Sequence, residues 1–307
     1  MVGSFSKNKK IYSLFFRGNW QKLCAKIIPN KRYIEWKYER RMGRRLDLHT
    51  PQTFTEKLQW LSLYWHNDLL TQCADKYEAR KFVEERVGTH ILKKLYNVYA
   101  NANEIKFEEL PNSFALKINH GSKQMILCTD KEKLDWQYSV RLLNAYIKNN
   151  NYYKFHEWAY KNITPLILCE EHLTKDGNAM QEYNFFCYDG VPRLVEITET
   201  IEDVKRVGMY DLDLKPSWRR YKTLPIINPV KATTQYYEML SYATKLSQGF
   251  PFVRVDLSYT QNRIYFGEMT FYPLGGMTPY NPKNFDEFLV SYLKLPTKTP
   301  SLQSGRA

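Results

Sequence analysis

The sequence has no long apolar run and no closely spaced pair of cysteines. No stretch of about 18 consecutive apolar residues occurs, so no segment is expected to span a membrane. The apolar segment after the basic start is too short for a secretory signal. The five cysteines lie far apart without a CxxC spacing, which argues against a zinc site or a disulfide framework. We therefore expect a protein of the reducing cytoplasm.

Two nucleotide-binding motifs are also missing. Neither G-x-G-x-x-G nor G-x-x-x-x-G-K-[ST] occurs, which removes the main support for dinucleotide-binding and P-loop folds. Helices followed by mixed helices and antiparallel hairpins indicate an α+β protein rather than a doubly wound sheet. Helices are expected at residues 31–43, 51–64, 71–88, 130–150 and 235–248, and strands at residues 96–100, 113–118 and 165–173. The Asp189-Gly190 pair predicts the turn of a hairpin over residues 181–197.

Acidic residues are scarce at the start of the chain. Residues 1–50 hold 13 Lys and Arg against 3 Asp and Glu, within a net charge of +13. Such a segment should attract an acidic membrane surface, an acidic glycan or nucleic acid. Residues 11–28 could form an interfacial helix on acidic lipid. For residues 31–43, a solvated helix face anchored by its aromatic residues is favoured over nucleic-acid binding. No RNP-like or KH-like block is present, so nucleic acid is not the expected partner.

The stretch from Pro251 to Gly276 is predicted to form two strands and a glycine-containing loop. One alternating set holds Phe252, Arg254 and Asp256, and after the turn it continues with Ile264, Phe266 and Glu268. With matching register, the Asp256 and Glu268 carboxylates would lie on one face. Magnesium with bound phosphate would offset the cost of burying these charges. A salt-bridged hairpin in an ordinary sheet explains the same pattern.

Two weaker patterns precede this hairpin. Lys117 lies on a predicted strand that runs into His120-Gly121-Ser122, a small-residue turn whose backbone N–H groups could bind phosphate. Such turns are common. The pair Asp75-Lys76, with Arg80 one helical turn later, is by itself typical of a surface ion-pair face.

Six blocks carry a family resemblance when they are taken in order. They are FTEKLQWLSLY, ADKYEAR, LPNSFALKINHGS, EYNFFCYDG, FPFVRVDL and IYFGEMTFYP, and the similarity spreads over residues 33–295. In this combination the sequence resembles the TupA-like branch of the ATP-grasp superfamily, which is found in bacterial surface-polysaccharide synthesis. The resemblance implies an ATP-grasp domain at residues 75–295, with the nucleotide between two subdomains. Residues 1–74 would form a basic helical region in place of the usual small α/β domain, and residues 296–307 a disordered tail.

The resemblance also implies roles for individual residues. Those expected to bind ATP fall into four groups. Lys76 and Lys117 would contact the phosphates, and the loop of His120, Gly121, Ser122 and Lys123 would close over them. Glu170, Glu171 and Leu173 would hold the adenine edge, and Glu182 would lie at the ribose. Those expected to hold Mg²⁺ are Asp256, Glu268 and Thr270, and the catalytic residues would be Arg254 and Lys117. His120 is expected to hydrogen-bond within its loop rather than to act as an acid or base. Lys123 and Asn184 depart from the family, in which glycine and lysine are common at these positions.

The implied chemistry is ATP-dependent amide formation. A substrate carboxylate would attack the γ-phosphate of ATP, and an amine would then displace phosphate from the acyl phosphate. Such a reaction requires positioning and charge neutralisation rather than a protein nucleophile. The family's setting implies a uronic acid of a capsule or lipopolysaccharide glycan and an amino acid or other amine, at the inner face of the membrane. A glycosyltransferase is the alternative, because Asp211 and Asp213 form a D-x-D.

Overall fold

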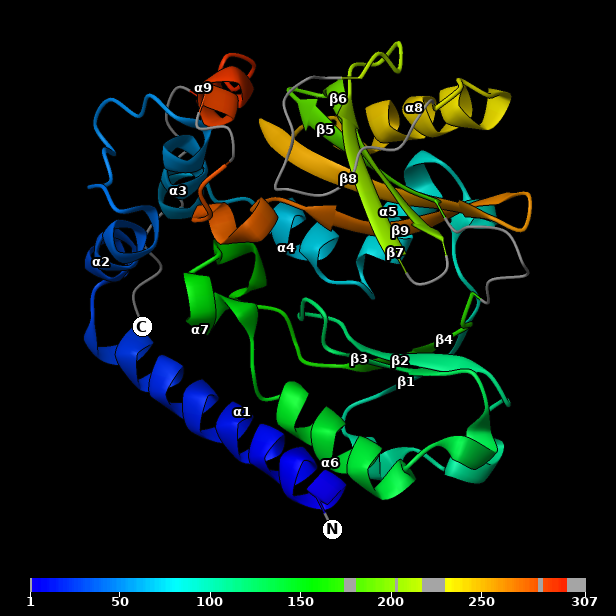
Figure 1. Cartoon of the computed structure of the whole chain (residues 1–307). Coiled ribbons are helices and arrows are strands. Elements are labelled where there is room, and N and C mark those ends of the chain that lie inside the picture. Colours follow the sequence, from blue (N-terminus) through cyan, green and yellow to red (C-terminus); the bar gives the residue numbers. More distant parts are fainter. Residues whose placement is uncertain (1, 174–180, 202–203, 217–229, 281–283, 297–307) are drawn as a thin grey trace.

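The protein is an α+β molecule built on two antiparallel sheets, as the sequence predicts (Figure 1). The computed structural model describes residues 2–173, 181–201, 204–216, 230–280 and 284–296. The predicted disordered tail lies, apart from its first residue, outside these described residues. None of the described helices is long and apolar enough to cross a membrane.

Helices account for the first part of the chain. They are α1 (Val2–Ile27), α2 (Asn30–Met42), α3 (Phe54–Tyr64), α4 (Asp68–Ala74) and α5 (Ala79–Arg86). Helix α2 ends at Gly43, whose φ of 70° is left-handed and suits glycine. Helix α3 begins with a capping box, in which the Thr53 hydroxyl accepts from the Glu56 N–H and the Glu56 carboxylate accepts from the Thr53 N–H. Both boundaries follow from local sequence.

The single helix expected over residues 71–88 is wrong, because the chain breaks between α4 and α5. Asp75 has extended backbone angles, and its carboxylate accepts the Tyr77 N–H at 2.8 Å. The Lys76 N–H then donates to the Asn119 carbonyl oxygen at 3.2 Å. A local Asx-type turn therefore replaces one helical turn and moves Lys76 out of the helix.

The smaller sheet has the strand order β1-β4-β2-β3. Its strands are β1 (Leu95–Tyr99), β2 (Phe114–Ile118), β3 (Met125–Cys128) and β4 (Ile167–Glu170). One face is apolar and packs against α1 and α6 (Trp136–Tyr146), with Phe114, Leu116 and Leu143 fully buried. Strand alternation turns Lys117 and Glu170 to the other face. Helix α7 (Asn151–Phe155) follows α6 in the chain.

The larger sheet has the order β7-β6-β5-β8-β9. Its strands are β5 (Gln181–Tyr188), β6 (Val191–Ile201), β7 (Val204–Tyr210), β8 (Phe252–Thr260) and β9 (Arg263–Thr270). One face packs against α4, α5 and α8 (Thr234–Ser247). Asp189 and Gly190 both have positive φ at the β5–β6 turn, as their sequence predicts. The 3₁₀ helices are η1 (Thr89–Ile91), η2 (Ala102–Glu104), η3 (Phe107–Glu109), η4 (Lys131–Lys133), η5 (Trp158–Tyr160) and η6 (Pro273–Gly276).

The opposite face of the larger sheet is divided into an apolar half and a polar half. Phe186 and Phe252 pack with Phe54 of α3 and Phe285 of α9 (Asn284–Val290). Further along the same strands, Arg254, Asp256 and their neighbours are polar. This half lies near the smaller sheet, because the charge of Lys117 on β2 acts on Glu268. The apolar half thus fixes the sheet against two helices, while the polar half is left facing a second sheet.

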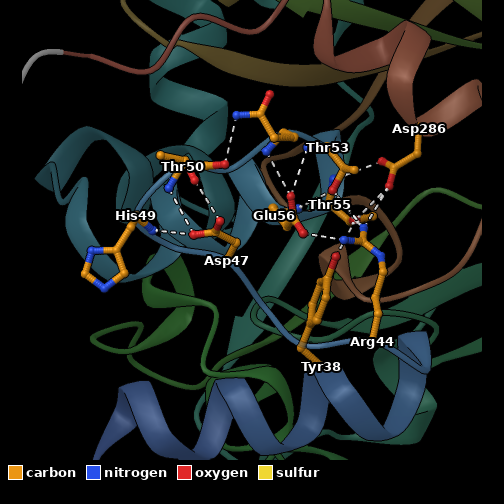
Figure 2. A network of polar contacts seen from close by, with 10 residues as sticks. Tyr38, Arg44, Asp47, His49, Thr50, Thr53, Thr55, Glu56 and Asp286 are labelled. Carbon is orange, nitrogen blue, oxygen red and sulfur yellow. Dashed lines mark hydrogen bonds and ion pairs between the residues drawn. The ribbon is translucent and has the colours of Figure 1, made fainter.

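A polar network joins α2, α3 and α9 (Figure 2). The Arg44 guanidinium contacts Glu56 and donates to Thr53 Oγ1 at 2.8 Å and to Asp286 Oδ2 at 3.4 Å. Asp286 also accepts the Thr55 N–H at 3.0 Å, and Tyr38 shares a hydrogen bond of 2.9 Å with Thr55. One arginine therefore ties the loop after α2 both to the start of α3 and to Asp286 of α9, which lies 242 residues further along the chain.

Candidate nucleotide and metal site

The β8–β9 hairpin brings two carboxylates side by side. Asp256 and Glu268 are direct cross-strand partners, as predicted. The prediction that Ile264 and Phe266 share the face of Glu268 is wrong. Gly267 is an extra residue in a β-bulge, so the side chains before it point to the opposite face from Glu268. Ile264 and Phe266 instead belong to the core with Leu257. A Cβ on Gly267 would lie 2.8 Å from the Asp256 carbonyl oxygen, so the bulge requires glycine.

Cations hold both carboxylates in place. Arg254 donates from Nε and Nη2 to the two oxygens of Asp256, at 2.7 and 2.6 Å. The Nζ of Lys76 lies 2.9 Å from Glu268 Oε2, and the Thr270 hydroxyl donates to Glu268 Oε1 at 3.4 Å. Burial raises the pKa of Asp256 to about 7. Burial would also raise the pKa of Glu268, but Lys76, Arg254 and Lys117 together outweigh burial and lower that pKa to about 2.

This donor set fits a metal ion that arrives with phosphate. The described residues contain no group of three or more His, Cys, Asp or Glu placed to hold a metal by themselves. Asp256 and Glu268 offer two carboxylates, and Thr270 adds a hydroxyl. Mg²⁺ is commonly bound by one or two carboxylates plus substrate phosphates. The salt bridges of the ordinary-sheet interpretation are present too, since Arg254 and Lys76 neutralise the same acids.

The opposite wall comes from the smaller sheet. Lys117 Nζ lies 3.0 Å from Glu170 Oε2, and Arg80 Nη1 lies 3.5 Å from Glu170 Oε1. Arg80 also donates to the Lys93 carbonyl oxygen at 2.8 Å. Residues of both walls line one cavity, among them Lys76, Arg80, Lys93, Lys117, Glu170 and Gly267. The two sheets therefore enclose a cavity that is lined by four cations. The Asp256–Glu268 pair lies close by, because Lys76 both lines the cavity and contacts Glu268.

Comparison with known protein families identifies the family of the chain. The family model described as TupA-like ATPgrasp matches residues 56–294. The chain belongs to the TupA-like ATP-grasp family. No curated protein matches the chain. Its fold is that of ATP-grasp proteins.

Solved structures similar to this TupA-like chain include several ligases. D-alanine–D-alanine ligase from Bacillus anthracis complexed with ATP is 13% identical with a TM-score of 0.43, covering 73% of this chain and 66% of that one. L-amino acid ligase from Bacillus licheniformis is 12% identical with a TM-score of 0.46, covering 80% and 56%. The ATP-grasp ligase PsnB, complexed with a precursor variant, Mg and ADP, is 9% identical with a TM-score of 0.40, covering 74% and 60%. The chain thus spans two thirds or less of the length of these ligases.

The loop expected to cover the phosphates follows β2 directly. His120 is fully buried, its Nε2 lies 3.1 Å from the Ile147 carbonyl oxygen, and burial lowers its pKa to about 4. Its ring is therefore neutral and occupied with the end of α6, which agrees with a structural role. The Gly121 carbonyl oxygen accepts from Lys76 Nζ at 2.9 Å, while Ser122 is exposed. Lys123 has a φ of 59°, in the left-handed region where glycine is favoured.

The residues expected around adenine and ribose lie at strand ends. The Glu170 carboxylate is engaged by Lys117 and Arg80, whereas Glu171 exchanges hydrogen bonds with the backbone of Lys94. Leu173 is half-buried, and Glu182 lies 3.4 Å from Lys205 Nζ. Asn184 donates to Glu196 at 3.2 Å. The nucleotide contacts of these residues stay predictions.

Two cations that line the cavity, Arg80 and Lys93, were not predicted as site residues. Arg80 was placed on a surface ion-pair face with Asp75 and Lys76, which is wrong, because Asp75 is buried against Asn119 and Arg80 contacts Glu170. The position of Arg80 four residues after Lys76 was the only sequence feature that linked it to the site. Lys93 precedes β1 without any motif, and burial together with Lys117 lowers its pKa to about 8. Lys93 becomes recognisable only in the folded structure, where its segment lies beside Lys76 and Lys117.

The D-x-D that suggested a glycosyltransferase belongs to a local turn. Asp211 Oδ1 accepts the N–H groups of Asp213 and Lys215, at 3.0 and 2.8 Å. Asp213 pairs with Lys215 at 3.6 Å. In the described part of the chain no metal-binding group of carboxylates forms there. The motif shapes the chain after β7 and adds no support for the alternative.

Proposed function

We propose that the protein is an ATP-dependent carboxylate–amine ligase that forms an amide through an acyl phosphate. The observation that carries the proposal is the pairing of Asp256 with Glu268 on the sheet face beside Lys76 and Lys117. Membership of the ATP-grasp family supports ATP and Mg²⁺ as its cofactors. Mg²⁺ bound with ATP would neutralise the charge of the phosphates during transfer.

Each charged group then has a task in phosphoryl transfer. Lys76 and Lys117 supply N–H donors to the phosphate oxygens, and both are held near the cavity by carboxylate partners. Asp256 and Glu268 present oxygen ligands, and Arg254 stabilises negative charge on the transferring group. The substrate carboxylate oxygen bonds to the γ-phosphorus as ADP leaves. The amine then bonds to the acyl carbon, phosphate leaves with the carboxylate oxygen, and the amine proton is lost to solvent.

Three cations beside this site support an acidic acceptor. Lys37 Nζ, Arg41 Cζ and Lys154 Nζ lie 4.9, 5.3 and 4.7 Å from the centre of the Phe155 ring. The ring packs against the loop after β9, since a Cβ on Gly275 would lie 3.0 Å from it. Burial and the neighbouring Arg41 and Lys154 lower the pKa of Lys37 to about 8. A substrate with several negative charges would relieve this repulsion.

An acidic glycan has the required chemistry. A uronic acid of a capsule or lipopolysaccharide offers the carboxylate to be activated and further negative charge along the chain. An amino acid or other amine would be the second substrate. The TupA-like family supports the polysaccharide setting, and the basic first 50 residues suit a cytoplasmic membrane face on which such a glycan is assembled.

The test is ADP release from ATP and Mg²⁺ with a panel of uronic acids crossed with amino acids. We expect turnover that requires one member of each set. Glu268→Gln should lower turnover by about a hundredfold or more, because a metal ligand is lost. The exposed Glu39→Gln is the matched control and should leave turnover unchanged. Sugar transfer from a UDP-sugar without ATP, or stabilisation against heat by UDP-sugars but not by ATP with Mg²⁺, would refute the ligase.

A further inference from the structure

Helix α1 leaves one apolar face in solvent. Tyr12, Phe16, Trp20, Leu23 and Ile27 are 74%, 78%, 60%, 49% and 70% exposed. Their spacings of four, four, three and four residues place all five within about 80° of arc on a helix. Single exposed apolar residues are ordinary, but a continuous row of large ones marks a contact surface. We call these five residues the α1 stripe.

The molecule itself covers the other side of α1. Ile11 is buried, and Leu14 and Phe15 pack with it against the core of the smaller sheet. The helix runs beside α6 at the edge of the molecule (Figure 1). It is therefore apolar on two faces, of which the protein buries one.

Close packing fixes the direction of the stripe. A Cβ on Gly18 would lie 2.0 Å from Asn149 Oδ1, so this glycine lets the helix approach the end of α6. Lys10 lies over the ring of Tyr146 and Lys22 over the ring of Tyr153, at 5.9 and 5.6 Å. Rotation of α1 to bury the stripe would break all three contacts. The stripe thus points away from the folded body.

Positive charge flanks the stripe on both sides. Residues 9–27 contain five basic residues and no acidic one. On the helical wheel, Lys10 and Arg17 fall on one side of the stripe and Lys22 and Lys26 on the other, about 80–120° from its centre. Arg17 and Lys26 are exposed, and their long side chains can extend along a lipid surface toward the headgroups while apolar groups enter the acyl region. Lys10 and Lys22 stay over their rings and add positive charge on the two sides.

We propose that α1 docks flat on a bilayer that contains anionic lipid, with the α1 stripe inserted at the boundary between headgroups and acyl chains. Two stripes pairing in a dimer would bring like charges together without an acidic partner. Nucleic acid would match the charge and the rings, but it has no use for Leu23 and Ile27. A bilayer satisfies the apolar row and the basic flanks together. The inference is independent of the ligase activity.

The test is co-sedimentation of the full chain with phosphatidylcholine vesicles with and without phosphatidylglycerol. We expect binding that requires phosphatidylglycerol and weakens with salt. The double variant Phe16→Ser/Trp20→Ser should lower the partition coefficient about tenfold or more, because two large apolar side chains no longer enter lipid. Tyr237→Ser is the matched control, since Tyr237 is 59% exposed on α8. All these side chains are exposed, so thermal melting and ADP release in solution should stay unchanged.

Several results would overturn the proposal. Wild-type protein that stays in solution with phosphatidylglycerol vesicles would do so, as would equal vesicle binding by the Phe16→Ser/Trp20→Ser variant. A dimer in solution that this variant dissociates would assign the α1 stripe to a second copy of the chain. Loss of heparin or RNA binding in the variant, with vesicle binding retained, would assign it to a polyanion.

Discussion

Glu157 follows α7 and is buried near enough to Glu268 to feel its charge. Burial raises its pKa to about 8, although Lys154 and Lys37 act in the opposite direction and Glu268 adds repulsion. Its neighbour Tyr160 also has a strongly raised pKa, caused by burial and by the same two glutamates. Charges from α2, α7 and β9 therefore converge around one glutamic acid that carries no sequence motif.

This single residue gives a pH prediction. Because the folded pKa lies above the ordinary 4.5, the folded protein binds more protons than the unfolded chain between about pH 4.5 and 8. The contribution of Glu157 is thus fully present at low pH and is lost as the pH rises toward 8. Glu157→Gln should remove this dependence and stabilise the protein relative to wild type at pH 9, by about 2–4 kcal/mol. Urea unfolding at pH 5 and pH 9 measures the difference, and equal pH slopes for both proteins would contradict it.

At the scale of secondary structure, the Arg44 network decides how α2 and α9 sit against α3. Asp286 and Glu56 are both buried, and Arg44 is the cation that contacts both of them (Figure 2). Burial raises the pKa of Asp286, and Thr55 and Arg44 counteract it. Without the guanidinium, two buried carboxylates would keep only their N–H and hydroxyl donors.

We expect Arg44→Ala to lower the free energy of unfolding by about 1–3 kcal/mol, since it leaves buried charge unpaired. Thermal melting or urea unfolding measures this loss. Arg45→Ala is the control, because the Arg45 side chain is 93% exposed and lies 4.0 Å from its partner Glu39. That change should fall within about 0.5 kcal/mol of wild type. A loss of the same size in both variants would show that the network adds nothing to stability.

For the whole molecule, Lys76 connects the two sheets. It precedes α5, contacts Glu268 on β9 of the larger sheet, and donates to the Gly121 carbonyl oxygen after β2 of the smaller one. ATP with Mg²⁺ bound between the sheets should therefore stabilise the entire fold rather than one half.

Lys76→Met should weaken ATP binding about tenfold or more, because a charged hydrogen-bond donor to phosphate is lost. The measurement is the rise in melting temperature with increasing ATP and Mg²⁺. Lys81→Met changes an exposed lysine on α5 and serves as the control. A Lys76→Met protein that is stabilised by ATP as strongly as wild type would remove this lysine from the nucleotide site.

Local sequence determined much of this protein. Thr53 and Gly43 fix helix ends and Asp189-Gly190 fixes a turn. The hairpin of β8 and β9 was predicted as well, but the pairing of Asp256 with Glu268 within it depends on the Gly267 bulge. These features depend on hydrogen bonds and periodicity between chain neighbours. The order of the six blocks was likewise enough to indicate the family.

The tertiary structure decided what depends on distant segments. The bulge at Gly267, the break at Asp75, the placement of Arg80 and Lys93 on the cavity, and the Arg44 network have no complete signal in local sequence. Helix α1 has two apolar faces, so its sequence shows no single apolar side. The sequence therefore could not say which face the protein buries. Burial and charge pairing arise only when segments far apart in the chain meet, which is why they required the folded structure.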